Sequence, residues 1–589
     1  MNFFDVVITN PLMVLIDWCY SLIPNYVLAI ILFTLLTRII IFPLSLWAQY
    51  QAVKLAKIKP KLDDIRAYYS HDWRKVLREQ RRLYKQEKYS TFISMLPLLV
   101  QIPIIVGVLR GIEQSDYLSA TPSTALLPVL ATVSAFALCY VQNFTNVLAK
   151  SMNFFSKWGF AIFMTAFSLY FTLVSGIGFG IYWIAGNVIA IIVQLVVNKI
   201  HNPKKHITYE ILPPEKKDRA LIKRQREKQN VDVRRFLKAK KHLVFYSEAS
   251  GFYKYFKDVI EYILENSKIH IHYLTSDIDD QVFKIDNPKF HAYYCGYRKL
   301  ITVLMRLDCK VCVMTMPDLH KYQYKRSIVN KQIEYIYMDH GFGSQTYVIR
   351  KHALDHFDTI FCYGENYNKE IRAMEKVHNS KEKNLVNVGF GLFNEMEKKY
   401  KLIMDKGNKE KKMVIIAPSW QKDNIFETCI DDIMKEFKKT DYEVLLRPHP
   451  EFIKRFPRKI SLLKSKYKDK LQLDFSVDIH NADIVITDWS SIGLELAWAA
   501  NKPTLFVNTP EKVLNPDWQQ YGLEPLELSL RDKIGVSIDM NEIDKIHDKL
   551  KQLSKIKNAR KILEEIAYNP KDAGHDGGAY IINTIKKRR

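Results

Sequence analysis

Residues 27–46 read VLAIILFTLLTRIIIFPLSL, and this stretch decides the character of the N-terminal part of the chain. Its twenty residues are almost all apolar, and a helix of that length crosses a hydrocarbon core of about 30 Å. Arg38 is the exception, because a guanidinium inside a span costs at least ~2.5 kcal/mol unless it reaches water or a polar partner. We therefore expect Arg38 to line a hydrated cavity; snorkelling or pairing with a lipid phosphate is the alternative.

Four further apolar runs follow, at 92–112, 125–149, 158–174 and 180–198. Five spans are therefore predicted, and the shorter run 11–24 is expected to lie along the outer interface. The connection 47–91 carries twelve Lys and Arg residues, whereas 113–123 carries none. Because basic loops face the cytoplasm, this asymmetry predicts an external N-terminus, a cytoplasmic helical hairpin at 47–91 and a cytoplasmic location for everything after the fifth span.

The motifs of this part resemble the YidC/Oxa-type membrane insertase core over about residues 10–200. The resemblance rests on LLTRIIIFPL at 35–44, the basic hairpin, LPLLVQIP at 96–103 and GFGIYW at 178–183. It implies that Arg38 lies in a hydrophilic groove, open to cytoplasm and lipid, that receives hydrophobic segments of nascent membrane proteins.

A basic segment joins this part to the rest of the chain. Residues 203–241 carry fourteen Lys and Arg against five Asp and Glu, within a chain of net charge +24. Anionic headgroups attract such a segment by about 1 kcal/mol per basic residue. Its juxtamembrane position favours anionic lipids as partners over nucleic acid, which is the competing interpretation of so much positive charge.

After residue 241, short apolar runs alternate with longer amphipathic ones, which is typical of parallel strands separated by helices. Two series of strands are predicted, so we expect two doubly wound units, 242–400 and 401–589, with a hinge near 398–412. The first series is 242–247, 268–275, 310–315, 333–338, 359–363 and 385–388. The second is 413–417, 442–446, 470–474, 484–487 and 504–507.

Polar clusters stand at the carboxyl ends of these predicted strands, where doubly wound folds bind ligands. Ser490 and Ser491 open an amphipathic stretch, so they are either phosphate-binding residues at a helix N-terminus or simple N-caps. Arg447 has a cationic fork suited to a diphosphate, or to a surface carboxylate. His449 suits hydrogen bonding to that diphosphate or protonation of a leaving oxygen. His340 precedes glycines on a turn, which suits a general base or a structural histidine.

These clusters resemble the CDP-glycerol glycerophosphotransferases of teichoic acid synthesis, the TagF/TagB-like family, over about residues 240–589. The resemblance also rests on Glu495, on Lys-Pro at 502–503 and on Asp-Gly at 576–577. The resemblance implies a GT-B fold in which an acceptor hydroxyl attacks the distal phosphorus of a CDP-alditol and CMP leaves. It implies His340 and His449 as catalytic residues, His340 being the base. The implied substrate-binding residues are Arg447, Asp488, Ser490, Ser491 and Glu495, with Glu495 at the ribose and His449 also on the diphosphate.

The sequence departs from the family motif after His340-Gly341, where Phe342-Gly343-Ser344 replaces Thr-Pro and a basic residue. The acceptor therefore stays open, and so does the choice between CDP-glycerol, CDP-ribitol and related donors. The resemblance implies no cofactor besides the donor.

No metal site is predicted from the sequence. Cys309 and Cys312 lie three apart on a predicted strand and so point to opposite faces. His270 and His272 have no carboxylate partner nearby in the sequence and are expected on the surface. The seven cysteines follow no regular spacing, which favours reduced thiols.

The sequence thus predicts an α-helical five-span membrane domain (1–202), a basic linker (203–241) and a GT-B-like double-Rossmann α/β domain. Our leading hypothesis is an enzyme of the cytoplasmic membrane that transfers a polyol phosphate from a CDP-alditol to a lipid-linked acceptor. The alternative hypothesis is a membrane protein insertase with a cytoplasmic nucleotide-binding module.

Overall fold

The computed structural model describes residues 5–69, 73–113, 126–175, 177–207, 209, 211, 219–404, 412–473, 479–568 and 572–588. The chain forms two compact units, Met1–Lys217 and Asp218–Arg589. The predicted linker 203–241 is therefore divided between the two units. The predicted hairpin turn near 70–72 and residues 405–411 of the predicted hinge at 398–412 lie outside the described residues.

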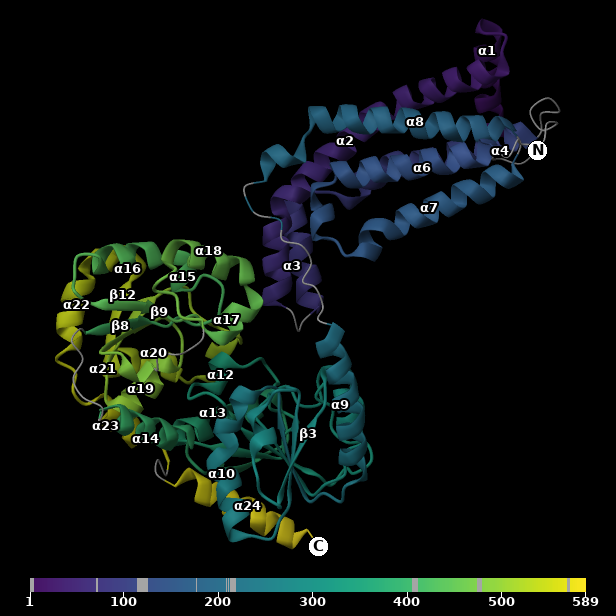
Figure 1. Ribbon diagram of the computed structural model, residues 1–589. Coiled ribbons are helices and arrows are strands. Elements are labelled where there is room, and N and C mark those ends of the chain that lie inside the picture. Colours follow the sequence, from purple (N-terminus) through teal and green to yellow (C-terminus); the bar gives the residue numbers. More distant parts are fainter. Residues whose placement is uncertain are drawn as a thin grey trace. The chain divides into compact units, whose positions relative to one another are not determined.

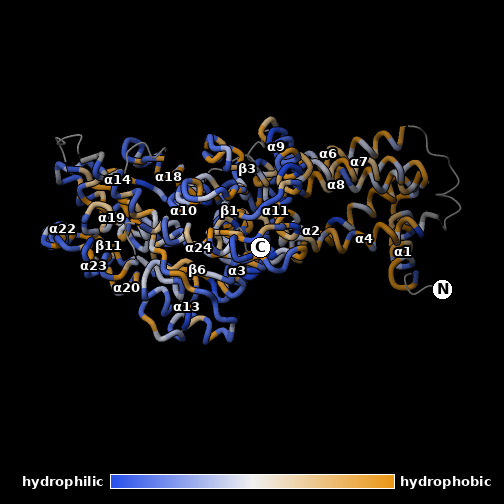
Figure 2. Tube along the Cα trace, turned by 90° about the horizontal axis from the view of Figure 1, so that it is seen from below, coloured by the Kyte–Doolittle hydropathy of each residue, from blue (hydrophilic) through white to orange (hydrophobic). Residues whose placement is uncertain are grey.

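The first unit consists of helices (Figure 1), and hydrophobic residues predominate along most of them, α3 being an exception (Figure 2). A core at one end of the bundle is built from α1, α2, α4, α6 and α8, for example by Ile16, Phe33, Val108 and Phe179. The helices are α1 (Asn10–Leu22), preceded by the π-helical turn η1 (Asp5–Thr9), α2 (Tyr26–Tyr68), α3 (Trp73–Gln86), α4 (Thr91–Glu113), α6 (Leu126–Thr145), α7 (Phe154–Val174) and α8 (Ile177–Ile200).

Among the described residues, six helical stretches are long and apolar enough to cross a membrane, by length and composition. The additional one is Asp5–Leu22, because η1 lengthens the first helical run to 18 residues. The sequence-based count of five spans is therefore corrected to six candidate helices. The run 11–24 also packs into the bundle through Ile16 and Cys19, which are buried against α2 and α4.

Helix α2 continues from its apolar half without a break into the basic segment, and α3 packs beside that basic half. Ile58 and Leu62 of α2 form an apolar cluster with Leu83 of α3. Lys61 and Glu87 add an ion pair with a distance of 2.8 Å between Nζ and Oε1.

The second unit contains two parallel sheets. The first sheet has the order β3-β2-β1-β4-β5-β6-β7, and the second has the order β12-β11-β10-β8-β9. Both orders reverse direction once, next to β1 and next to β8, as in doubly wound folds. This arrangement confirms the predicted GT-B-like α/β architecture.

The strands of the first sheet are β1 (Leu243–Ser247), β2 (Ile271–Thr275), β3 (Phe290–Tyr294), β4 (Val311–Met314), β5 (Glu334–Met338), β6 (Thr359–Cys362) and β7 (Asn384–Asn387). Those of the second are β8 (Met413–Ile416), β9 (Glu443–Leu446), β10 (Ile484–Thr487), β11 (Thr504–Asn508) and β12 (Gly535–Asp539). The helices are α9 (Arg219–Lys238), α10 (Tyr253–Asn266), α11 (Tyr297–Met305), α12 (Gln345–Val348), α13 (Glu365–His378), α14 (Leu392–Met404), α15 (Ile425–Thr428), α16 (Ile430–Phe437), α17 (Pro450–Arg455), α18 (Pro457–Tyr467), α19 (Ile492–Ala500), α20 (Leu526–Ser529), α21 (Arg531–Ile534), α22 (Ile546–Leu553), α23 (Ala559–Ile566) and α24 (Ala573–Lys587).

The strand predictions fail at three places. β3 and β12, at the edges of their sheets, were not predicted. The predicted strand 470–474 is also wrong, because over its described residues only Leu471 pairs, in a single bridge to Leu446. All seven cysteines are buried free thiols.

Two segments outside the predicted first subdomain pack on its sheet. In α9, Phe236 is fully buried in the core and the Asp232 carboxylate accepts a hydrogen bond from the Tyr294 N–H at 3.0 Å. In α24, Ile581 and Ile585 are buried against the other face, and α24 lies beside α10 (Figure 1). The C-terminal helix therefore belongs to the first subdomain, not to 401–589 as the sequence predicts.

Candidate active site

The site begins at the direction reversal of the second sheet. β8 and β10 are neighbours there, and the loops that follow them start at Ala417 and Asp488. In doubly wound sheets, ligands bind in the crevice beyond such strand ends. The chain following β9 and β11 reaches the same carboxyl edge, because all strands of the sheet are parallel.

Asp488 is the centre of this edge, and its side chain is fully buried. Its Oδ1 accepts hydrogen bonds from the N–H groups of Ser419 at 2.7 Å and Trp489 at 2.6 Å, and its Oδ2 accepts one from Ile425 at 3.3 Å. Burial raises the pKa of Asp488. The carboxylate therefore connects the loops after β8 and β10, and direct binding of substrate by Asp488 stays a prediction.

Ser490, Ser491 and Glu495 lie at the start of α19. The Ser490 Oγ is 3.5 Å from the Ile492 N–H, a long N-cap contact, and Ser491 Oγ donates to Glu495 Oε1 at 2.9 Å. Both serines are half-buried, whereas Glu495 is buried. Gly493 allows the helix to approach the sheet, because a Cβ there would lie 2.7 Å from Phe506 Cε1. The first amides of α19 therefore face the same edge as the loop after β8.

His449 follows β9 and caps α17. Its Nδ1 accepts the Glu451 N–H at 3.1 Å, so Nδ1 carries no proton and Nε2–H is the donor. Burial, then the charge of Lys512, lowers the pKa of His449 to about 3. The residue is therefore neutral near pH 7 and suited to hydrogen bonding rather than to protonating a leaving oxygen. Arg447, two residues earlier, is half-buried, and its backbone N–H donates to the Ile416 carbonyl at 2.9 Å.

His340 follows β5, at the carboxyl edge of the first sheet. Its Nδ1 lies 3.1 Å from the Thr315 carbonyl oxygen, which can only accept, so Nδ1 carries the hydrogen and Nε2 keeps a free lone pair. Asp339 Oδ1 is 3.8 Å from the same Nδ1, and Asp339 is buried. The ring is 39% exposed and meets Phe252 edge-on at 5.4 Å between centroids.

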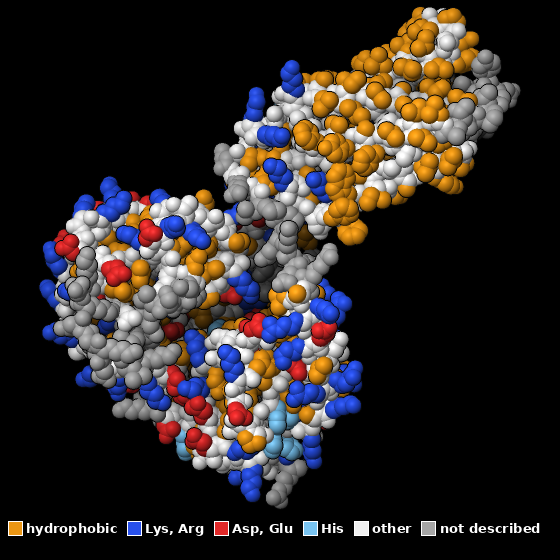
Figure 3. Space-filling model, viewed as in Figure 1, with side chains coloured by type: hydrophobic (Ala, Val, Ile, Leu, Met, Phe, Trp, Pro, Cys, Tyr) orange, Lys and Arg blue, Asp and Glu red, His pale blue; other side chains and the backbone are white. Residues whose placement is uncertain are grey.

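The N-terminal end of α10 faces both histidine-bearing edges. Burial, then the charges of Glu495 and Asp339, raises the pKa of Tyr255, which contacts the His340 ring edge-on at 6.1 Å. Lys254, its neighbour, is close enough to contribute to the lowered pKa of His449. The residues predicted from both halves of the second unit therefore face one region, and the surface of that unit is hollowed between two lobes (Figure 3).

Several residues that shape the site were not predicted from the sequence. Arg531 donates to the Asp488 carbonyl at 2.8 Å and lies 4.1 Å from the centre of the Trp489 ring. Lys512 lies near Asp488, and burial lowers its pKa. The Glu527 carboxylate accepts the Ser344 N–H at 3.1 Å, and burial raises its pKa to about 7. Of these three, only Lys512 could have been predicted from the sequence, because it follows the end of a predicted strand, as the predicted site residues do.

In the first unit, Arg38 of α2 donates from Nη1 to Gln101 Oε1 of α4 at 2.9 Å. A Cβ at Gly186 of α8 would lie 3.4 Å from Arg38 Nη2. The arginine is thus half-buried among three helices, and its polar partner comes from the second quoted motif. The predicted hydrated cavity around it remains a prediction.

We predict that Asp488→Ala opens the loops after β8 and β10. Three buried N–H groups lose their acceptor, at about 1–3 kcal/mol each, so local protection should fall by about 3 kcal/mol or more. Hydrogen exchange over 417–425 and 488–500 measures this. Ser490→Ala is the control, with an effect within about 0.5 kcal/mol; equal protection in Asp488→Ala and wild type would contradict the positioning role.

We predict that His449 makes stability fall in mild acid. Its pKa is about 3 when folded against 6.5 for an ordinary histidine, so only the unfolded chain takes up the proton as pH drops below about 6.5. His449→Asn keeps the helix cap but does not titrate. Its melting temperature should therefore decline less than that of wild type between pH 7 and pH 5; parallel profiles would refute the assignment.

Two family models match the chain. Residues 18–205 match the 60Kd inner membrane protein family, and residues 229–524, just over half of the chain, match the CDP-glycerol:poly(glycerophosphate) glycerophosphotransferase family. The membrane protein insertase YidC of Wolinella succinogenes is 30% identical over 210 residues, 33% of this chain and 38% of that protein. YidC of Shewanella sp. (strain MR-7) is 30% identical over 200 residues, 32% and 36% respectively. The chain thus spans less than two fifths of the length of these relatives.

Among solved structures, the wall teichoic acid polymerase TagF aligns at 13% identity and a TM-score of 0.40, covering 63% of this chain and 95% of that one. S. aureus MnaA with UDP aligns at 14% identity and 0.40, covering 59% and 97%. The apolar helices and the first family match describe a multi-pass inner-membrane protein. The chain belongs to the CDP-glycerol:poly(glycerophosphate) glycerophosphotransferase family, and a YidC-like membrane region precedes its transferase region.

Proposed function

We propose that the second unit transfers a polyol phosphate from a CDP-alditol, CDP-glycerol first among them, to an acceptor hydroxyl and releases CMP. The observation that carries this proposal is that two histidines, one at the carboxyl edge of each sheet, hold opposite tautomers. His340 presents a lone pair at Nε2, whereas His449 presents a hydrogen at Nε2. A base on one side and a hydrogen-bond donor on the other is what phosphoryl transfer to a hydroxyl needs.

In the proposed reaction, His340 Nε2 takes the proton of the acceptor hydroxyl. The oxygen of that hydroxyl attacks the distal phosphorus of the CDP-alditol. The bond from that phosphorus to the bridging oxygen breaks, and CMP leaves with the electron pair. Asp339, 3.8 Å from His340 Nδ1, stabilises the imidazolium that forms. The Nε2–H of His449 and the guanidinium of Arg447 balance the growing charge on the diphosphate.

The donor is proposed to lie at the edge of the second sheet. The amides of α19 and the hydroxyls of Ser490 and Ser491 would hold diphosphate oxygens, since helix N-termini favour anions. Glu495 would accept from a ribose hydroxyl in place of Ser491. Lys512 is an additional cation at this edge. We propose no cofactor and no metal ion for this step, and no nucleic acid as a partner.

The acceptor is proposed to be lipid-linked and to be met at the inner leaflet of the cytoplasmic membrane. Charge asymmetry of the loops supports a cytoplasmic second unit. The basic residues of 203–241 would contact anionic lipids and keep the unit near that surface.

We predict that purified full-length protein in detergent releases CMP from CDP-glycerol when lipid extract is added. His340→Ala should lower the rate by about 10²–10⁴-fold, because general base catalysis is lost. His449→Asn should lower it by about 10²-fold, because the cap survives and only the donor to the diphosphate is removed.

His356→Ala is the matched control, because this histidine is exposed, and it should leave the rate unchanged. Lipid extracts of different headgroup composition and CDP-ribitol identify the acceptor class and the donor. Absence of release from both donors in folded protein, or full activity of His340→Ala, would reject the transferase mechanism.

A second candidate function is membrane protein insertion, with the second unit as a nucleotide-binding module. It is favoured by one contact, the Arg38–Gln101 hydrogen bond, which holds a half-buried cation within a largely apolar helix bundle. Such a group suits the passage of polar segments of nascent membrane proteins.

We predict that, if this function is present, the full chain supports growth of cells depleted of their insertase and Arg38→Gln does not. CMP release then separates the two functions, because Arg38→Gln should leave it intact unless the arginine also binds the acceptor headgroup. Failure of the wild-type chain to complement, at normal membrane abundance, would remove this candidate.

A further inference from the structure

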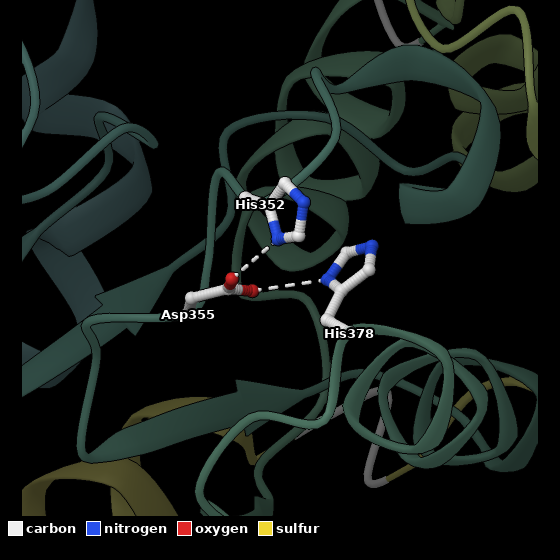
Figure 4. A group of neighbouring side chains, drawn as sticks. All are labelled: His352, Asp355 and His378. Atoms are coloured by element: carbon white, nitrogen blue, oxygen red, sulfur yellow. Dashed lines mark hydrogen bonds and ion pairs between the residues drawn. The ribbon is translucent and has the colours of Figure 1, made fainter.

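Three side chains that the transferase mechanism does not use converge beside the first sheet (Figure 4). His352 lies in the turn after α12, Asp355 lies between this turn and β6, and His378 is the last residue of α13. They are separated in the sequence by up to 26 positions, so no spacing motif announced them.

Both histidines direct Nδ1 at the Asp355 carboxylate, each at a different oxygen (Figure 4). His352 Nδ1 lies 2.7 Å from Asp355 Oδ2, and His378 Nδ1 lies 3.0 Å from Asp355 Oδ1. One ligand atom from each residue falls within 4.8 Å of the others. Ligand atoms about 2.0–2.1 Å from a tetrahedral zinc ion are about 3.3 Å apart, so binding of an ion would lengthen these two N···O distances slightly.

The surroundings are closed on one side and open on the other. The side chain of His378 has no exposed surface and that of Asp355 is 19% exposed, whereas His352 is 44% exposed. Two ligands are therefore held firmly, and solvent reaches the cluster past the third. This is the geometry of a site that keeps one coordination position for water.

The second nitrogen of the buried histidine also has a partner. His378 Nε2 lies 2.8 Å from the Tyr521 hydroxyl, which in turn receives the Asn515 amide at 3.3 Å. A hydroxyl accepts as well as donates, so Nε2–H can donate to Tyr521 once Nδ1 binds an ion. Metal-binding histidines characteristically have such a partner on the other ring nitrogen.

We infer that His352, Asp355 and His378 bind a divalent transition-metal ion, Zn²⁺, through three protein ligands with water in the fourth position. Two imidazoles and one carboxylate suit Zn²⁺ better than Mg²⁺ or Ca²⁺, which prefer oxygen ligands. The site lies outside the proposed transferase chemistry and does not depend on it. It differs from the sequence-based expectation of no metal site.

The ion has a structural role in this arrangement. Tyr521 belongs to the 3₁₀ turn η7 (Trp518–Tyr521), which follows β11 of the second sheet, whereas the three ligands belong to the first subdomain. Fixing His378 therefore also fixes the segment 515–521 against α13, so the ion joins the two subdomains.

The test uses full-length protein in detergent, stripped with a chelator and titrated with Zn²⁺ against a fluorescent zinc indicator. Co²⁺ substitution reports geometry through its visible d–d absorption. Wild type should bind one equivalent of Zn²⁺. His352→Ala and Asp355→Asn should lose this binding or bind the ion at least about 10-fold more weakly, since even changes to residues that only contact the ligands cost that much. Zn²⁺ should slow hydrogen exchange over 515–521 in wild type but not in these two variants.

Two controls separate this site from other histidines. His356→Ala removes an exposed neighbour of Asp355. His291→Ala disrupts a second group of imidazoles, in which His270 Nδ1 lies 2.9 Å from His291 Nε2. This group also contains His272, which is buried and not on the surface as the sequence predicts. Both control variants should still bind this equivalent of Zn²⁺, and their hydrogen exchange over 515–521 should still slow when it binds. Equal Zn²⁺ binding by wild type and His352→Ala, or no binding by wild type, would reduce the cluster to a hydrogen-bonded His–Asp–His group and overturn the inference.

Discussion

The candidate site depends on one buried carboxylate, which accepts hydrogen bonds from three backbone N–H groups. Asp488 joins the loop after β8 to the loop after β10, and these loops flank the reversal of the second sheet. A charge is costly to bury, and here the amides of the protein replace the hydration it loses. Arg531 holds the same turn from the other side through the Asp488 carbonyl. The α19 amides and Lys512 are arranged around this turn.

The sequence predicted the central strands well, because strands covered on both faces are continuous apolar runs. β1, β4 and β8 are fully buried and were all predicted. β3 and β12 were missed because half-buried residues, among them His291 and Ser537, interrupt their apolar runs. The apolar residues at 470–474 indicated a strand, but the pairing needed to make one comes from tertiary structure. Likewise, η1 extends the first helical run although its sequence alone is too short to indicate a span.

For the site, the sequence indicated where chemistry lies but not how each residue takes part. Strand ends identify His340, His449 and Asp488, because parallel strands bring their carboxyl ends to one edge. Whether a side chain faces the substrate or holds a loop depends on its partners, and these come from distant segments: Ser419 for Asp488, Thr315 for His340. The tautomers of the two histidines follow from such partners and carry no sequence signal.

The return of α24 to the first sheet has a mechanical consequence. The chain crosses from the first subdomain to the second after α14 and crosses back before α24, so two covalent connections join the lobes. A single tether allows rotation about any axis, whereas two tethers leave one easy motion, bending about the line through both. Removing α24 would remove one of the two connections between the lobes and expose the face of the first sheet that α24 covers.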